Sequence, residues 1–269
     1  MSPLFPTEFC VALAPGRIEI TRRAYGLKRR IESWRRADLA PAGGETSGWR
    51  FAIDALAELL AGESSIRGRV QVVLSSHWVR FQVVPWNAGI TTPAEFAEYA
   101  RACFAQVHGE VTDGWETRVD PAAAGQGRMA CAIDRELLAN LAELIEGRGR
   151  RLIGVQPYLM HAFNPIASLV GRKRFLFVLV EPGRATLAAA DRGAWCSVSN
   201  SPLAEGDDAL AALIGRELQL IGDGAPTEVL VHAPRVASES LARVEAAGWQ
   251  LIPAGGGADY AMAWGTRPR

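Results

Sequence analysis

The sequence predicts an α/β protein in which a meander of three strands followed by a helix occurs twice. Three observations lead to this fold class. Apolar residues make up 49% of the 269 residues and charged residues 22%, as in an ordinary globular protein. Stretches typical of strands alternate with amphipathic helical stretches. Residues 11–20 (VALAPGRIEI) and 178–187 (VLVEPGRATL) share four identities in ten, and each segment opens a meander.

The first meander is predicted over about residues 9–34. Apolar residues 9–14 lead to the turn Pro15-Gly16, an alternating stretch follows at 17–21, and a third strand ends near Trp34. Eight basic residues lie between positions 17 and 36, and we expect most of them to face solvent. A Gly-containing break then precedes a helix predicted over 49–60, with one apolar stripe made of Phe51, Ala55, Leu56, Leu59 and Leu60.

The middle of the chain contains the best-marked helix. Thr92 is the expected N-cap, Pro93 the first helical residue, Glu95 the partner in a capping box and Gly109 the terminator. Its expected buried stripe is Phe96, Tyr99, Cys103, Phe104 and Val107. Strands are predicted at 70–74, 77–84, 115–119, 128–133 and 152–155, with a helix capped by Asp134 before the last of them.

The second meander is predicted from residue 175 to residue 198, with Pro182-Gly183 at its first turn. A helix over about 207–221, a strand at 228–231 and a helix capped by Ser238 follow. We expect two more strands, at 249–252 and 260–264, on either side of a glycine-rich loop.

Composition narrows the function classes. The formal net charge is zero, which gives no global attraction to nucleic acid or anionic lipid. The longest apolar runs, among them 175–180, have six residues, far fewer than the roughly 20 of a membrane-spanning helix, so no direct membrane insertion is expected. The N-terminus lacks the pattern of a signal peptide, which favours the cytoplasm.

Four widely spaced cysteines, Cys10, Cys103, Cys131 and Cys196, are expected to be buried thiols.

Three further stretches carry a family resemblance: residues 72–81 with Pro85-Trp86, residues 132–157 and the second meander, 175–198. With the duplicated meander, the sequence resembles the actin-like (actin/Hsp70/sugar-kinase) superfamily. Within it, the sequence looks most like the degenerate PilM and GspL cytoplasmic-domain families of type IV pili and type II secretion. The resemblance implies an actin-like two-lobe fold: a first lobe at 1–172, with a subdomain inserted at about 75–133, and a second lobe at 173–269.

The same resemblance implies a function. Those families are cytoplasmic scaffolds, so we expect protein partners: the cytoplasmic tail of an inner-membrane assembly protein and a motor ATPase. The protein would then lie at the inner face of the inner membrane, held there by its partner.

Active members of the superfamily place an Asp-x-Gly turn in each lobe to hold phosphate and Mg²⁺. Here the corresponding residues depart from the pattern: the first turn has no carboxylate, and each turn loses an N–H donor to proline. We interpret them as vestiges of a phosphate site and expect neither a cofactor nor catalysis. They are Pro15, Gly16 and Arg17 in the first lobe, and Glu181, Pro182, Gly183 and Thr186 in the second.

Alternatives remain open. A nucleotide-dependent ATPase or small kinase could use Glu181 in place of the usual Asp, and a nucleic-acid module could use the basic segment 17–36. Ser75-Ser76-His77 places a hydroxyl near an imidazole, but neighbours on a strand face opposite sides, so a serine nucleophile is disfavoured. The four histidines show no metal-binding spacing, so no metal site is expected.

Overall fold

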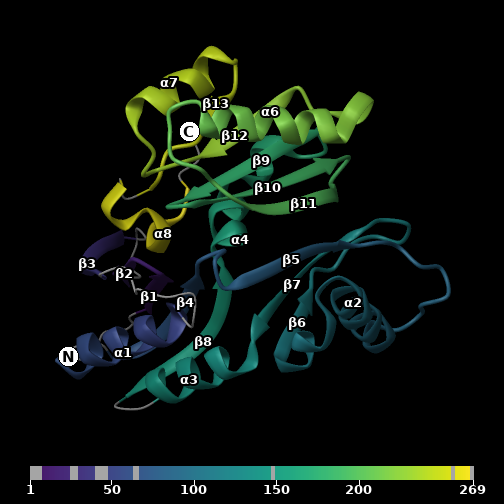
Figure 1. Cartoon of the computed structure of the whole chain (residues 1–269). Helices are drawn as coiled ribbons and strands as arrows, with labels where there is room; N and C mark the ends of the chain where they lie inside the picture. The colour runs from purple at the N-terminus through teal and green to yellow at the C-terminus, as the bar shows by residue number, and fades with distance from the viewer. Residues whose placement is uncertain are drawn as a thin grey trace.

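The computed structural model describes residues 8–24, 30–39, 48–62, 67–146, 149–255 and 258–266. Two five-stranded sheets dominate the fold (Figure 1). The first sheet has the strand order β3-β2-β1-β4-β8, and together with its helices it is called the first lobe below. Its strands are β1 (Glu8–Ala14), β2 (Arg17–Ala24), β3 (Arg30–Asp38), β4 (Gly68–Leu74) and β8 (Arg150–Pro157).

The second sheet repeats this topology, and with its helices it is called the second lobe. Its strand order is β11-β10-β9-β12-β13. In each sheet an antiparallel three-stranded meander is followed by strands that pair in parallel. The predicted duplication is therefore confirmed. The strands are β9 (Phe175–Glu181), β10 (Arg184–Asp191), β11 (Ala194–Pro202), β12 (Glu228–His232) and β13 (Gln250–Leu251).

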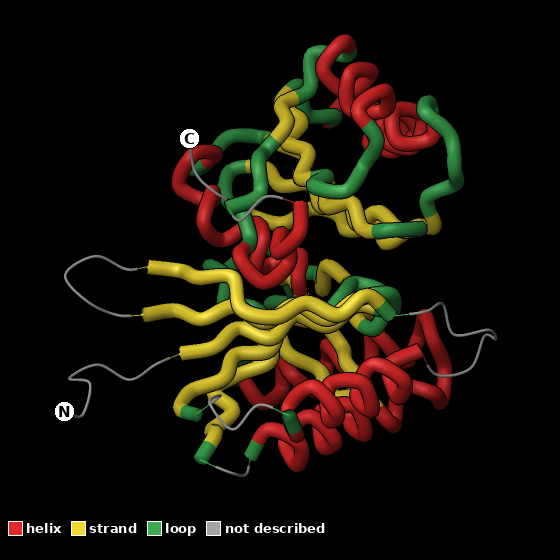
Figure 2. Tube along the Cα trace, turned by 90° about the vertical axis from the view of Figure 1, so that its left-hand side faces the viewer, coloured by secondary structure: helices red, strands yellow, loops and turns green. Residues whose placement is uncertain are grey.

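Helices cover the outer faces of both sheets. The helices α1 (Gly48–Ala61) and α3 (Arg135–Ile145) share a core with β1, β2 and β4, and Figure 2 shows them together against that sheet. The helices α6 (Ala209–Ile221) and α7 (Ser238–Ala246) bury their apolar residues against the second sheet. Burial of one helix stripe against one sheet face is the usual source of stability for such layers.

The inner faces of the two sheets share a third core. Cys10 and Val73 of the first sheet lie in one buried cluster with Phe177 and Leu230 of the second. Short helices fill the space between them (Figures 1 and 2): α4 (Tyr158–Phe163), η2 (Asn164–Ile166), α5 (Ala167–Val170) and α8 (Ala261–Trp264). The lobes are therefore joined by continuous apolar packing. The predicted boundary between them at residue 172 stays a prediction.

A third sheet, of strand order β5-β7-β6, extends from the side of the first lobe. Its strands are β5 (Val79–Val84), β6 (Trp115–Val119) and β7 (Arg128–Asp134). Helix α2 (Pro93–His108) buries Phe96, Ala100 and Phe104 against one face of this sheet. A short helix, η1 (Gly109–Gly114), links α2 to β6. The predicted capping box is confirmed, because the Glu95 N–H donates to Thr92 Oγ1 and the Thr92 N–H donates to Glu95 Oε2.

Several sequence-based predictions were wrong in detail. In α1 the buried residues are Trp49, Ala52, Ile53, Leu56 and Leu60, while Phe51 is 42% exposed. In α2, Val107 is 64% exposed, because the stripe that faces the small sheet is narrow. Residues 260–264 form a turn of helix between the lobes instead of a strand. Of the four thiols, Cys10 is buried, Cys103 and Cys131 are partly buried, and Cys196 is exposed.

Candidate functional site

The two proline-containing turns flank one small cavity between the lobes, which is lined by Ala14 and Arg17 beside the first turn and by Glu181 and Pro182 at the second. Pro15-Gly16 joins β1 to β2, and Pro182-Gly183 joins β9 to β10. Glu181, at the end of β9, is buried and binds the first lobe: the Ser75 hydroxyl donates to Oε1 at 2.5 Å and the Ser76 N–H donates to Oε2 at 2.9 Å. Burial raises the pKa of Glu181, and these hydrogen bonds oppose the increase.

The Oγ atom of Ser75 also lies 2.9 Å from Nδ1 of His77. The two groups are close, contrary to the prediction, because residues 75–78 form a turn and not a strand. The Trp78 N–H closes this turn by donating to the Ser75 carbonyl. Burial, with help from Arg184 and Arg80, lowers the pKa of His77 to about 4, so the imidazole is neutral at pH 7. The Ser75 side chain is buried, however, so its hydroxyl is closed to a substrate.

On the other side of the turns, Glu19 of β2 is 2% exposed. Its carboxylate forms an ion pair of 3.0 Å with Arg235 and accepts the Ala263 N–H at 3.0 Å. Burial outweighs the effect of this N–H and of Arg17, and raises the pKa of Glu19 to about 7. Arg17 itself pairs with Asp38 at 2.7 Å. Glu19 and Arg17 are therefore both already paired, with Arg235 and Asp38 respectively.

Little space remains between the turns. The cavity bordered by Arg17, Glu19, Glu181, Pro182 and Arg235 has a volume of about 30 Å³. One water needs roughly 10–15 Å³ measured in this way, so the cavity has room for about two waters. Small-molecule sites commonly span about 300–1,000 Å³. In this conformation the cavity is too small for a nucleotide.

The remaining predicted residues have structural partners. Thr186 is buried on β10, and its hydroxyl donates to Asn200 Oδ1 at 3.4 Å. Gly183 has φ +71°, a conformation that side-chain-bearing residues rarely adopt. His232, at the end of β12, is fully buried, and its Nε2 lies 2.9 Å from Tyr158 Oη. The interpretation of these residues as a vestigial phosphate site stays a prediction.

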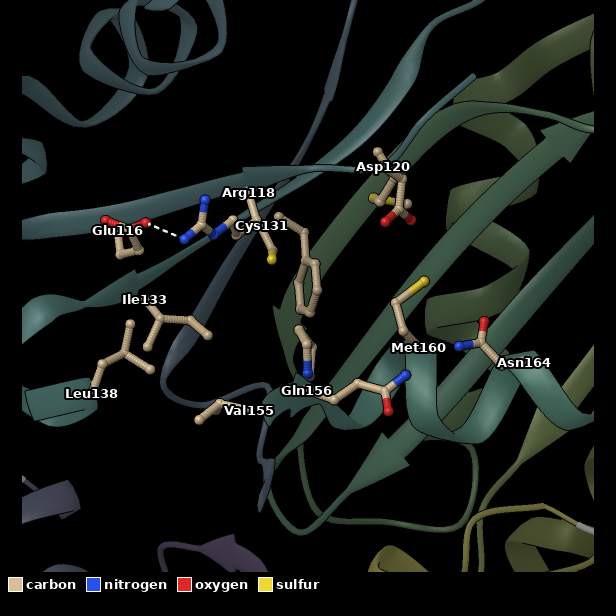
Figure 3. A pocket seen from close by; sticks show the side chains of 13 residues that line it. Glu116, Arg118, Asp120, Cys131, Ile133, Leu138, Val155, Gln156, Met160 and Asn164 are labelled. Carbon is tan, nitrogen blue, oxygen red and sulfur yellow. Dashed lines mark ion pairs between the residues drawn. The ribbon is translucent and has the colours of Figure 1, made fainter. Parts of the chain in front are cut away.

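A larger cavity, of about 410 Å³, lies against the face of the third sheet opposite α2 (Figure 3). We call it the third-sheet groove. Its floor contains Cys131 of β7 and its cross-strand partner Phe81 of β5, and Arg118 of β6, the partner of Cys131 on the other side, lies at the rim. Its opposite wall belongs to β8 and α4 of the first lobe. The lining residues are Phe81, Glu116, Arg118, Asp120, Met129, Cys131, Ile133, Leu138, Val155, Gln156, Pro157, Met160 and Asn164.

The groove has an apolar floor and a polar rim. Arg118 is paired with Glu116 at 2.9 Å, and burial raises the pKa of Asp120. Burial also raises the pKa of Cys131 to about 12, so this thiol is protonated at pH 7 and is a weak nucleophile. Sequence analysis missed the groove. The available signal was the apolar alternation of Met129, Cys131 and Ile133, on the face of β7 that α2 leaves uncovered.

Other site types find no support in the part of the chain that the structure describes. No group of three or more His, Cys, Asp or Glu side chains there is arranged to hold a metal ion. Within the same residues, no helix combines the length and apolarity needed to cross a membrane.

Comparison with known proteins rests on structure alone, since no family model and no curated protein sequence matches the chain. A PilM structure from the PilM–PilN type IV pilus biogenesis complex is similar at 14% identity with a TM-score of 0.66, covering 93% of this chain and 89% of that one. A Bacteroides thetaiotaomicron protein of actin-like ATPase fold and unknown function is 11% identical, with a TM-score of 0.62 and coverage of 92% and 91%. The chain has a PilM/GspL-like actin-like fold.

A third similar structure is the cytoplasmic domain of EpsL, an inner-membrane component of the Vibrio cholerae type II secretion system. It is 11% identical, with a TM-score of 0.56, and the match covers 86% of this chain and 84% of that domain. The actin-like resemblance and the two-lobe α/β fold class are thereby confirmed. At these identities the similarity establishes the fold, and function has to be argued from the site.

Proposed function

We propose that this protein is a non-catalytic assembly-platform protein of a type IV pilus or type II secretion-like machine, and that it binds an extended segment of a partner protein in the third-sheet groove. The observation that carries the proposal is the contrast between two cavities. The space between the turns is about 30 Å³, whereas the groove is about 410 Å³. A further cavity, of about 490 Å³, borders Pro15, but none of its lining residues belongs to the second lobe, so it does not span the two phosphate turns.

The chemistry of the groove suits a peptide. Phe81, Leu138 and Met160 line the groove and are partly exposed, so they offer apolar surface for side chains. Gln156 and Asn164 at the opposite wall carry amides that can bond a peptide backbone (Figure 3). The outer edge of β6 has no strand partner among the described residues. Apolar anchors inside a polar rim are the usual composition of a protein interface.

The similar structures support the choice of partner. PilM was solved in complex with PilN, and EpsL is an inner-membrane component of a secretion system. We propose by analogy that the segment in the groove is the cytoplasmic tail of an inner-membrane assembly protein, and that a motor ATPase binds elsewhere. The protein would then act in the cytoplasm at the inner face of the inner membrane.

The absence of catalysis is part of the same proposal. Pro15 and Pro182 each remove a backbone N–H from a phosphate turn, and the carboxylate of Glu181 is occupied by Ser75 and Ser76. Phosphoryl transfer depends almost entirely on positioning and charge compensation, so these changes weigh against it.

A matched pair of arginines tests the groove. Arg118 on the groove rim and Arg101 on α2 are both exposed, and each is paired with one glutamate, at 2.9 and 2.6 Å. A photo-crosslinking residue at position 118 should capture, in the source cells, the cytoplasmic segment of a membrane protein, identified by mass spectrometry. The same residue at position 101 should not. Cys131→Trp, which fills the floor, should abolish the capture.

Equal crosslinking at positions 118 and 101 would contradict the proposal. So would capture that persists unchanged in Cys131→Trp, provided that circular dichroism shows the variant to be folded.

A further inference from the structure

One buried carboxylate, in the second lobe, differs from the other buried carboxylates in its partners. Four glutamates are buried among the described residues: Glu8, Glu19, Glu181 and Glu217. Glu8 pairs with Arg23, Glu19 pairs with Arg235, and Glu181 accepts a hydroxyl and a backbone N–H. Glu217, on α6, is 7% exposed and accepts one hydrogen bond, from the Ser199 hydroxyl at 3.0 Å. No described cation lies within ion-pair distance of it.

Glu217 lines a cavity of about 430 Å³ between the C-terminal half of α6 and the β10–β11 end of the second sheet. The walls are mostly apolar, formed by Ala189, Ala190, Leu220, Ile221 and Pro226. Buried charges in proteins are normally paired, because transfer of an unpaired carboxylate into apolar surroundings is costly. An open cavity beside such a carboxylate therefore favours a cationic ligand.

A second observation points the same way. Ser197, two residues before Ser199 on β11, lines the same cavity, and its hydroxyl oxygen is buried without a hydrogen-bond partner among the described residues. Buried hydroxyls are normally bonded. The cavity thus contains a carboxylate and a hydroxyl that can both accept N–H groups.

Among the described residues, Arg174 is the one cationic residue that lines the cavity, and it is already neutralised. Arg174 pairs with Asp191 at 2.9 Å, and this pairing lowers the pKa of Asp191. The ligand must therefore bring its own positive charge. At the mouth, Leu220 is 74% exposed, the highest exposure among the large apolar residues described. An exposed leucine beside a buried anion is complementary to a partner chain in which an apolar group and a cationic group are adjacent.

We infer that this cavity binds an arginine side chain presented by a partner protein. A guanidinium has five N–H donors in a planar fork, enough to satisfy both Glu217 and Ser197. Its methylene stem would pack on Leu220 and Ile221. This surface belongs entirely to the second lobe and shares no residue with the third-sheet groove. The inference therefore goes beyond the proposed function and can succeed or fail separately from it.

The test uses N-acetyl-arginine amide as the probe and its neutral analogue, N-acetyl-citrulline amide, as the control, titrated to millimolar concentration into ¹⁵N-labelled protein. We expect saturable NMR shifts at residues 189–197 and 217–224 with arginine and none with citrulline. Glu217→Gln should weaken binding at least about tenfold, since it removes the charge. Glu239→Gln, at an exposed position on α7, should bind like the wild type.

Because a buried substitution can disturb the fold, Leu220→Arg supplies a second variant at an exposed position, where added positive charge should also weaken binding. In cells, a photo-crosslinking residue at position 220 should capture a partner peptide that contains arginine, and Glu217→Gln should suppress this capture. Equal shifts with citrulline, no shifts with arginine, or crosslinks that are insensitive to Glu217→Gln would each overturn the inference.

Discussion

Glu19 of the first lobe and Arg235 of the second form an ion pair of 3.0 Å at the interface between the lobes, with the glutamate 2% exposed. The pair is part of a larger junction. Asp259 pairs with Arg36 of β3, and its carbonyl accepts a hydrogen bond from Arg17. The Ala263 N–H donates to the same Glu19 carboxylate. The segment around α8 therefore connects the second lobe to the meander of the first.

The first prediction is a pH dependence caused by Glu19. Its pKa is raised to about 7 in the folded protein, against about 4.3 for an unperturbed glutamate. The folded state therefore binds the proton more tightly than the unfolded state. The resulting stabilisation is complete below about pH 4 and is lost as the pH rises through about 7.

Urea unfolding at pH 5 and pH 8 measures this effect. Between the two, the wild type should lose about 2 kcal/mol more free energy of unfolding than Glu19→Gln, which cannot titrate. Glu58→Gln, at an exposed position on α1, should behave like the wild type. Parallel pH profiles for wild type and Glu19→Gln would show that the pKa of Glu19 is not raised.

The second prediction concerns Ser75 and Glu181. Ser75→Ala removes the hydroxyl that donates to the buried carboxylate, leaving Glu181 with the Ser76 N–H. We expect a loss of about 1–3 kcal/mol in the free energy of unfolding, the cost of an unsatisfied buried acceptor. In a double-mutant cycle with Glu181→Gln, the two losses should be less than additive, because both substitutions remove the same interaction. Strict additivity would show that the contact contributes nothing.

Local signals predicted the arrangement of the chain. The repeated Pro-Gly turns at 15–16 and 182–183 marked the duplicated meander, and Thr92 with Glu95 marked the start of α2, because turns and caps depend on a few neighbouring residues. The strand predicted over 260–264 was wrong, because the structure of this segment depends on distant contacts. An apolar run of five residues carries no helix or strand preference strong enough to outweigh the packing between the lobes.

The sites were harder to predict, because they depend on contacts between distant segments. Glu181 and Ser75 are 106 positions apart, and the two walls of the third-sheet groove come from different sheets. Glu181 was singled out from the sequence as a candidate site residue, but its partners could not be derived from spacing. Glu217 lies on a helix that was predicted well, yet nothing in its neighbouring residues shows that it is buried.

The third prediction concerns the anchoring of α8. Gly265 has φ +73°, and a Cβ at this position would lie 2.9 Å from the carbonyl oxygen of His161 in α4. Gly265→Ala should therefore lower the free energy of unfolding by more than about 1 kcal/mol, through backbone strain and the clash together. Gly154→Ala is the control, since a Cβ there meets nothing within 4 Å. Equal stability of both variants would contradict the close packing of α8 on α4.

The last prediction addresses the nucleotide site. A ligand present at 100 times its dissociation constant stabilises the folded state by about 2.7 kcal/mol. In a chain of this length that corresponds to an increase of about 5–10 °C in the melting temperature. With a cavity of about 30 Å³ between the turns, and with Glu181 bound to Ser75 and Ser76, we expect millimolar Mg-ATP to leave the melting temperature unchanged.

A matched measurement with Mg-ADP and with Mg²⁺ alone controls for ionic effects. An increase of the expected size with Mg-ATP would favour the ATPase or kinase alternative. It would also require the lobes to open, because the nucleotide could bind only after the contacts of Glu181 with Ser75 and Ser76 had separated. In that case Ser75→Ala, which weakens this contact, should increase the shift, and Glu181→Gln should abolish it if the carboxylate holds the metal.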